Sequence, residues 1–123
     1  MRLYHVSVKS CQASISREGI SPAYSTGNLE AVWLVSEKYL DWAMLHVQRR
    51  HAASLSDILV YEVWVSRLKL RRTNRPGRWC TVKTIPTSAI LDTYDSDDME
   101  KAERDFAEWE RQRYGEMGQE SRG

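Results

Sequence analysis

The first candidate for chemistry is a histidine close to the N-terminus. His5 lies within the mostly apolar segment of residues 3–7. A neutral imidazole offers one hydrogen-bond donor and one acceptor, which suits it to the hydroxyl groups of a ligand. A polar ring in an apolar strand also needs a partner, because burying an unpaired polar group costs free energy. Two interpretations follow: His5 faces a ligand cleft, or it is a buried histidine that bonds to the backbone.

The charges form the second feature, because they are unevenly distributed although the formal net charge is only +1. One segment is basic and contains Arg67, Lys69, Arg71, Arg72, Arg75 and Arg78. A later segment is acidic and contains Asp92, Asp95, Asp97, Asp98, Glu100, Glu103, Asp105, Glu108 and Glu110. A basic segment attracts phosphate groups, and an arginine-rich hairpin that is merely solvated is the alternative.

The remaining composition predicts one ordinary globular domain. The chain has 123 residues, of which 41% are hydrophobic and 28% charged, so it can bury a single core. No apolar run is long enough to cross a membrane, and the N-terminus does not resemble a signal peptide, so we expect a cytoplasmic protein. Cys11 and Cys80 match no metal-binding spacing, and neither a zinc site nor a disulfide framework is predicted.

Alternating strand and helix patterns position these residues in the first half of the chain. A strand over residues 3–7 precedes an amphipathic helix over 9–18, which Gly19 ends. Residues 21–28 have the composition of an exposed loop at one rim of a cleft. The apolar run 32–35 predicts a buried strand, and Ser36 is a candidate N-cap for a helix over residues 37–53.

Strands and one long helix are predicted for the second half. The segment 58–65 alternates as a strand, with Leu59, Tyr61, Val63 and Val65 on its core face, and Leu68 and Leu70 extend it. A turn at 74–77 leads into a strand that includes Trp79, and residues 85–90 form another strand. Ser96 is expected to cap a final helix over 96–114 that packs on the domain of residues 1–95 or on a partner. Residues 115–123 are expected to fray.

The order of five short motifs resembles the ADP-ribosyltransferase fold. The motifs are Leu3-Tyr4-His5, Arg17-Glu18-Gly19-Ile20, Val32-Trp33-Leu34-Val35-Ser36, Val60-Tyr61-Glu62-Val63 and Ile85-Pro86-Thr87-Ser88-Ala89-Ile90, which together cover roughly residues 3–91. The resemblance implies an α+β domain with a split antiparallel β-sheet, flanking helices and a long C-terminal helix. It also implies NAD, or another nucleotide of the ADP-ribose type, as the ligand.

The resemblance assigns roles to five residues. His5 corresponds to a histidine that binds the adenosine ribose of NAD, and Trp33 or Tyr39 would stack on the nicotinamide ring. Ser36 matches a small hydroxyl residue that lines the pocket, and Arg17 could reach the pyrophosphate. His5 and Tyr39 are thus the expected catalytic residues. Packing of Trp33 and Trp42 in the core, a helix cap at Ser36 and a solvated Arg17 are the alternatives.

One departure from the family bears directly on catalysis. Transferases of this fold generally carry a glutamate at the start of a late strand, where it stabilises the cationic transition state, but this chain has Arg78-Trp79-Cys80-Thr81 there. Glu62 is the remaining strand acid, and its alternation places it on the other face, as a cross-strand partner of an arginine. The sequence therefore supports two alternative functions: transfer of ADP-ribose to a protein or nucleic-acid acceptor, and binding of an ADP-ribose-like nucleotide or of a partner without catalysis.

The arginines support two further hypotheses. RNA 2′-phosphotransferases, a related branch, use arginine and histidine in place of the glutamate, which would make Arg71, Arg72, Arg75 and Arg78 phosphate clamps. That branch usually has an extra N-terminal domain, which we do not expect in this protein. Alternatively, the arginine hairpin binds a nucleic-acid backbone while Trp79 stacks on a base. The acceptor and the oligomeric state do not follow from the sequence.

Overall fold

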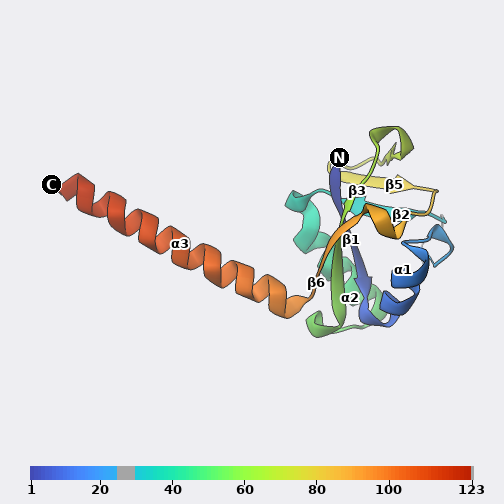
Figure 1. Ribbon diagram of the computed structural model, residues 1–123, viewed down its shortest axis with the longest axis horizontal. Helices are drawn as coiled ribbons and strands as arrows, with labels where there is room; N and C mark the ends of the chain where they lie inside the picture. Colours follow the sequence, from blue (N-terminus) through green and yellow to red (C-terminus); the bar gives the residue numbers. More distant parts are fainter. Residues whose placement is uncertain (25–29, 123) are drawn as a thin grey trace.

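The computed structural model describes residues 1–24 and 30–122, and it is an α+β protein. A compact body carries the sheet and two of the helices, and the third helix projects from it (Figure 1). The strands are β1 Arg2–Val8, β2 Val32–Val35, β3 Ile58–Trp64, β4 Arg71–Arg72, β5 Arg78–Thr81 and β6 Ile90–Tyr94. All adjacent strands are antiparallel, in the order β4-β5-β2-β1-β3-β6.

The sheet is nearly divided between β1 and β2. These two strands pair at a single position, where Tyr4 lies opposite Val35. In contrast, β1 pairs with β3 along its whole length, from Arg2 opposite Trp64 to Val8 opposite Ile58. The four residues of β2 all pair with β5. The sheet therefore consists of two well-paired halves, β4-β5-β2 and β1-β3-β6, joined at one end.

Helices follow both central strands. The 3₁₀ turn η1, Lys9–Cys11, leads into α1, Gln12–Glu18, which ends at Gly19 with a φ of 81°. The turn η3, Glu37–Tyr39, leads into α2, Leu40–His51, and α3 spans Ser96–Arg122. Shorter 3₁₀ turns are η2 Pro22–Tyr24, η4 Leu55–Asp57, η5 Arg67–Lys69 and η6 Thr87–Ala89. A left-handed Gly19 is the helix stop that the sequence predicted.

Apolar side chains are buried on both faces of the sheet. Leu3, Leu34 and Tyr61 belong to one cluster, together with Ile15 of α1. Val6 and Val60 belong to a second cluster that also contains Ala43 of α2. The prediction of a single core face for residues 58–65 was therefore wrong, because α2 covers the second face as well.

Several predicted boundaries were also wrong. Leu70 lies after the turn η5 and does not continue β3. Ile85 makes an isolated bridge with Ile20, so the last strand begins only at Ile90. The first turn of α3 is capped by Asp95, not by Ser96, because the side chains of Asp95 and Asp98 each accept a hydrogen bond from the other's backbone N–H, at 2.9 and 3.0 Å.

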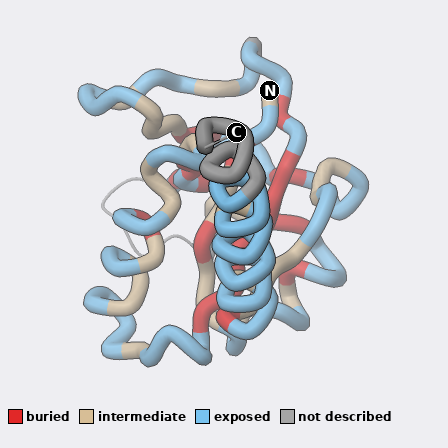
Figure 2. Tube along the Cα trace, turned by 90° about the vertical axis from the view of Figure 1, so that its left-hand side faces the viewer, coloured by how far each residue is buried: buried red, intermediate tan, exposed pale blue. Residues whose placement is uncertain are grey.

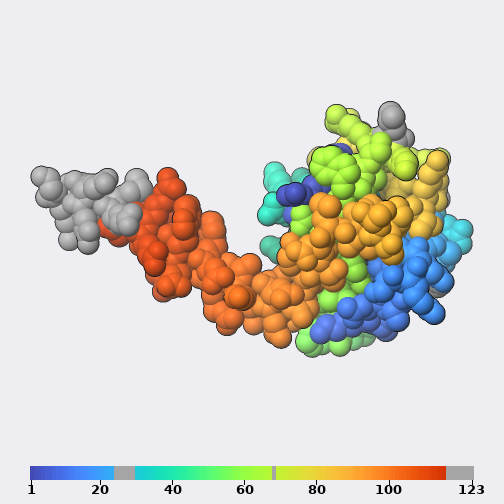
Figure 3. Space-filling view, viewed as in Figure 1, coloured from blue at the N-terminus to red at the C-terminus, as the bar shows by residue number. Residues whose placement is uncertain are grey.

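Only the beginning of α3 packs on the body. Met99 contacts the cluster beneath α2, whereas Phe106, Trp109 and Tyr114 are 58%, 50% and 65% exposed. The helix extends away from the sheet, and most of its side chains between residues 100 and 115 are exposed (Figures 2 and 3). It continues past Gly115 to Arg122, although the sequence predicted an end at residue 114. Most of α3 thus does not pack on its own domain.

Candidate functional site

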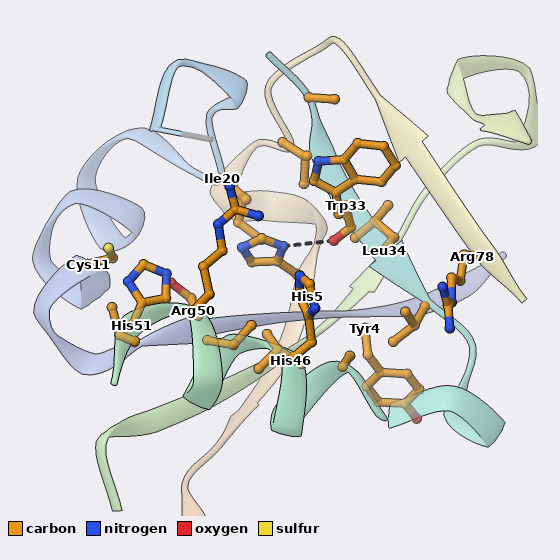
Figure 4. A pocket seen from close by; sticks show the side chains of 18 of the residues that line it. Tyr4, His5, Cys11, Ile20, Trp33, Leu34, His46, Arg50, His51 and Arg78 are labelled. Carbon is orange, nitrogen blue, oxygen red and sulfur yellow. Dashed lines mark hydrogen bonds between the residues drawn. The ribbon is translucent and has the colours of Figure 1, made fainter. Parts of the chain in front are cut away.

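A cavity of about 580 Å³ lies where β1 and β2 separate. Its walls come from β1, β2, α1, α2 and the turn between β4 and β5, so residues far apart in sequence meet there (Figure 4). The polar and aromatic residues lining it include Tyr4, His5, Ser7, Ser10, Ser14, Ser21, Trp33, Trp42, His46, Arg50, His51, Thr73, Asn74, Arg75 and Arg78. The volume is in the range of small-molecule sites.

His5 spans the gap between the two halves of the sheet. Its ring Nδ1 donates a hydrogen bond to the backbone carbonyl of Trp33, at 3.0 Å (Figure 4). Because a carbonyl can only accept, Nδ1 carries the proton, and Nε2 of the neutral ring is an acceptor. Burial lowers the pKa of His5, although the bond to Trp33 opposes this. Both interpretations of His5 are therefore compatible: one nitrogen bonds to the backbone and the other can accept a ligand hydroxyl.

Arg78 connects the β4–β5 turn to α2. Its guanidinium carbon lies 3.4 Å from the centre of the Trp42 ring, which also stacks on His46 at a centroid distance of 5.1 Å. The buried Nε of Arg78 has no hydrogen-bond partner in the described part of the chain. Loss of solvent contact and the neighbouring Arg75 both lower the pKa of Arg78. The guanidinium of Arg78 thus places a positive charge in the cavity wall, where it can attract an anion.

The helix α2 supplies residues that the sequence analysis did not identify. Trp42, His46 and Arg50 occur at intervals of four residues and all line the cavity, with His51 beside them. Residues spaced by four lie on one face of a helix. This stripe runs next to the apolar stripe of α2 that packs on the sheet. The spacing of four residues was the sequence signal that could have identified these residues as neighbours on one face. Of these residues, Trp42 alone had been named, within the stretch that the resemblance associates with nicotinamide stacking and with core packing as the alternative.

The cavity has a strongly basic and aromatic lining. All three histidines of the chain and three of its arginines line it, and no described lining residue is an aspartate or glutamate. Such a lining favours an anionic ligand with hydroxyl groups and a flat ring. It provides no carboxylate to stabilise a developing cation.

The structure brings together only some of the predicted site residues. His5, Trp33, Arg75 and Arg78 line the cavity. Arg71 and Arg72 lie on the edge strand β4, and Arg17 is exposed on α1, away from the lining.

Ser36 and Tyr39 also lie outside the cavity lining. Gly77 adopts a φ of 72° directly against both side chains, and its carbonyl accepts a hydrogen bond from the Ser36 N–H at 2.9 Å. Ser36 occupies the N-cap position of η3 without a side-chain cap bond. The β4–β5 turn thus packs on Ser36 and Tyr39, two of the five residues to which the resemblance assigned ligand roles. The predicted rim at residues 21–28 is represented by Ser21, and residues 25–29 lie outside the described part.

Glu62 makes structural contacts with Arg2 and Tyr94 and does not face the cavity. Its Oε1 lies 2.8 Å from Arg2 Nε, and its Oε2 accepts a hydrogen bond from the Tyr94 hydroxyl at 2.8 Å. That bond, together with burial, raises the pKa of Tyr94. The predicted cross-strand pairing of Glu62 with an arginine is confirmed, and Glu62 does not line the cavity.

Comparisons with known proteins do not assign the chain to a family. It matches no protein-family model and no protein of curated function. Within residues 1–24 and 30–122, no group of three or more metal-ligating side chains comes together. In the same residues, no helix is sufficiently long and apolar to cross a membrane.

Proposed function

We propose that the cleft between β1 and β2 binds a nucleotide of the NAD or ADP-ribose type. The observation that carries this proposal is the composition of the cavity wall, where histidines, arginines and tryptophans meet without a described carboxylate. A dinucleotide combines phosphates, ribose hydroxyls and flat rings, and each of these groups has a counterpart in the wall.

The position of each residue suggests how such a ligand would lie. Nε2 of His5 would accept a hydrogen bond from a ribose hydroxyl, because Nδ1 already donates to Trp33. The ring of Trp33 is 44% exposed, so it is accessible to a base or a nicotinamide ring, whereas Arg78 and His46 lie against the ring of Trp42. The guanidinium of Arg78, which lines the cavity, would attract a phosphate.

Transfer of ADP-ribose from NAD is the second candidate. The separation of the sheet at His5 favours it, since the resemblance to the ADP-ribosyltransferase fold implies this split and this histidine. Transfer breaks the bond between nicotinamide and the ribose carbon, and the acceptor then bonds to that carbon and loses a proton. The cationic transition state requires negative charge nearby. Glu62 is bound to Arg2 and Tyr94 outside the cavity, so we favour binding over transfer.

Calorimetric titration with NAD, ADP-ribose and adenosine tests the proposal. We expect ADP-ribose to bind more tightly than adenosine, because only ADP-ribose carries phosphates for the arginines. His5→Ala should weaken binding of ADP-ribose, whereas the matched control Arg17→Ala, on the exposed face of α1, should leave it unchanged.

Chromatography of the same NAD sample separates the two candidates. Binding of NAD without release of nicotinamide supports a nucleotide-binding protein, and release supports a transferase or an NAD-cleaving enzyme. If neither NAD nor ADP-ribose binds, the proposed ligand class is wrong.

A further inference from the structure

The cavity continues onto a basic surface formed by the half-sheet β4-β5-β2. Cys80 of β5 lies opposite both Arg71 of β4 and Trp33 of β2. Directly opposed residues of antiparallel strands project from the same face of a sheet. Arg71, Cys80 and Trp33 thus form one row across three strands, and Trp33 at its end lines the cavity.

A second row on this face leads into the same cavity. Arg78 lies opposite Val35, two residues from the first row on both strands, so it shares the face of Trp33. Its guanidinium covers the ring of Trp42, and Arg75 in the adjoining turn also lines the cavity. Arg71 and Arg78 thus lie on the sheet face that carries Trp33, and this face leads from the sheet edge to the cleft.

The segment that forms this sheet edge carries only positive charges. Residues 67–78 contain six lysines or arginines and no acid. Five of the six, Arg67, Lys69, Arg71, Arg72 and Arg75, are exposed. Exposed cations attract phosphates, and the exposed ring of Trp33 on the same face can stack on a base that is not already stacked in a duplex.

We propose that this surface binds single-stranded nucleic acid, with its phosphates along Arg71 and Arg75 and a base against the exposed ring of Trp33. The surface is continuous with the cleft, so one nucleotide of the strand can enter the proposed nucleotide site. This last point rests on the proposed function, whereas strand binding by the surface does not. A duplex binds less well, because its bases are stacked and cannot reach the indole rings.

Fluorescence anisotropy with a short labelled oligothymidylate and a duplex of equal length tests this inference. The single strand should bind more tightly, and its affinity should fall steeply as salt rises from about 50 to about 200 mM. Arg71→Gln lies outside the cavity and should lower the oligonucleotide affinity and reduce the salt slope by about 0.7, while ADP-ribose binding stays unchanged. Arg17→Gln, on exposed α1, is the control and should change neither.

Trp33→Ala tests the stacking contribution. It should weaken oligonucleotide binding by between about fivefold and about a hundredfold, as expected for loss of one stacked base. Circular dichroism and thermal unfolding would show that the variant folds, and Trp33→Phe should restore part of the affinity because it keeps a flat ring.

The outcomes distinguish this inference from the proposed function. Loss of oligonucleotide binding in Arg71→Gln with normal ADP-ribose binding supports both. ADP-ribose binding without oligonucleotide binding overturns only the inference about the basic surface. Oligonucleotide binding without ADP-ribose binding supports the basic surface but contradicts the nucleotide proposal.

Light scattering at low salt provides a further check. Self-association that Arg71→Gln abolishes, without oligonucleotide binding, would overturn the inference and point to the acidic α3 of a second copy as the occupant.

Discussion

The ring of His5 donates a hydrogen bond to the carbonyl of Trp33 just beyond the point where β1 and β2 stop pairing. One residue earlier, Tyr4 still lies opposite Val35. The side chain thus links the two half-sheets where backbone pairing has ended, and the cleft opens beside this link. His5 therefore has a structural role in the cleft in addition to the ligand contact that we propose.

His5→Ala should lower the free energy of unfolding by about 0.5 to 1.5 kcal/mol. The variant loses the hydrogen bond between the half-sheets and leaves the Trp33 carbonyl without this donor. Urea denaturation followed by tryptophan fluorescence measures the change. Arg17→Ala is the control and should shift stability by less than about 0.5 kcal/mol. Equal midpoints for His5→Ala and the unmodified protein would show that the link contributes nothing to the joining of the half-sheets.

His5 should also make stability depend on pH. Burial lowers its pKa in the folded state, so the unfolded chain, with an ordinary value of about 6.5, takes up the proton first as the pH falls. The contribution of neutral His5 is complete above about pH 6.5 and is lost as the pH falls through the lower folded value. The difference in unfolding free energy between the unmodified protein and His5→Ala should therefore shrink as the pH is lowered from about 7.5 to about 5, a range that brackets the ordinary histidine pKa. A constant difference would contradict the lowered pKa.

Arg78 and Trp42 should be energetically coupled. Their close cation–π contact, at 3.4 Å, holds the β4–β5 turn against α2. A double-mutant cycle of Arg78→Ala and Trp42→Ala measured by chemical denaturation should give a coupling of about 0.5 to 2 kcal/mol. Arg72 and Trp79 lie farther apart, at 5.5 Å, and should give a smaller value. Additive effects of Arg78→Ala and Trp42→Ala would show that the stacked contact does not hold the cavity wall.

Two glycine substitutions should have opposite effects. Gly77 has a φ of 72°, and an added Cβ would overlap the ring of Tyr39 and the Ser36 hydroxyl. Gly77→Ala should therefore cost at least about 1 to 3 kcal/mol. Gly115 lies within α3 and has open space around it, so Gly115→Ala should stabilise the helix by up to about 1 kcal/mol. Thermal unfolding measures the first effect and helix content by circular dichroism the second. A neutral Gly77→Ala would contradict the packing of the turn on η3.

Glu62 should matter for stability and not for ligand binding. Glu62→Gln keeps the shape of the side chain but removes the charge that pairs with Arg2, so we expect a loss of about 1 to 3 kcal/mol. Tyr94→Phe removes the other partner and should cost about 1 kcal/mol. Calorimetry with ADP-ribose should give unchanged affinity for both variants. A selective loss of nicotinamide release in a stable Glu62→Gln protein would instead show that Glu62 takes part in catalysis.

The sequence by itself determined the elements whose patterns are local. The strands at β2 and β3 and the helix α2 were predicted from their apolar patterns, as was the stop at Gly19, although the alternation along β3 did not mark a single core face. Short-range periodicity reflects which side chains face the core, so it can be recognised without knowing the partner elements. The arginine hairpin was also recognised from its turn residues and charge.

Only the tertiary structure decided which residues share the cleft. Where β1 and β2 stop pairing depends on how β3 and β5 hold them, and no local pattern encodes that point. The packing of the turn at Gly77 likewise placed Ser36 and Tyr39 outside the cavity, while α2 directed His46 into it. The site is assembled by contacts between distant segments, and therefore its composition followed from the fold and not from the motifs.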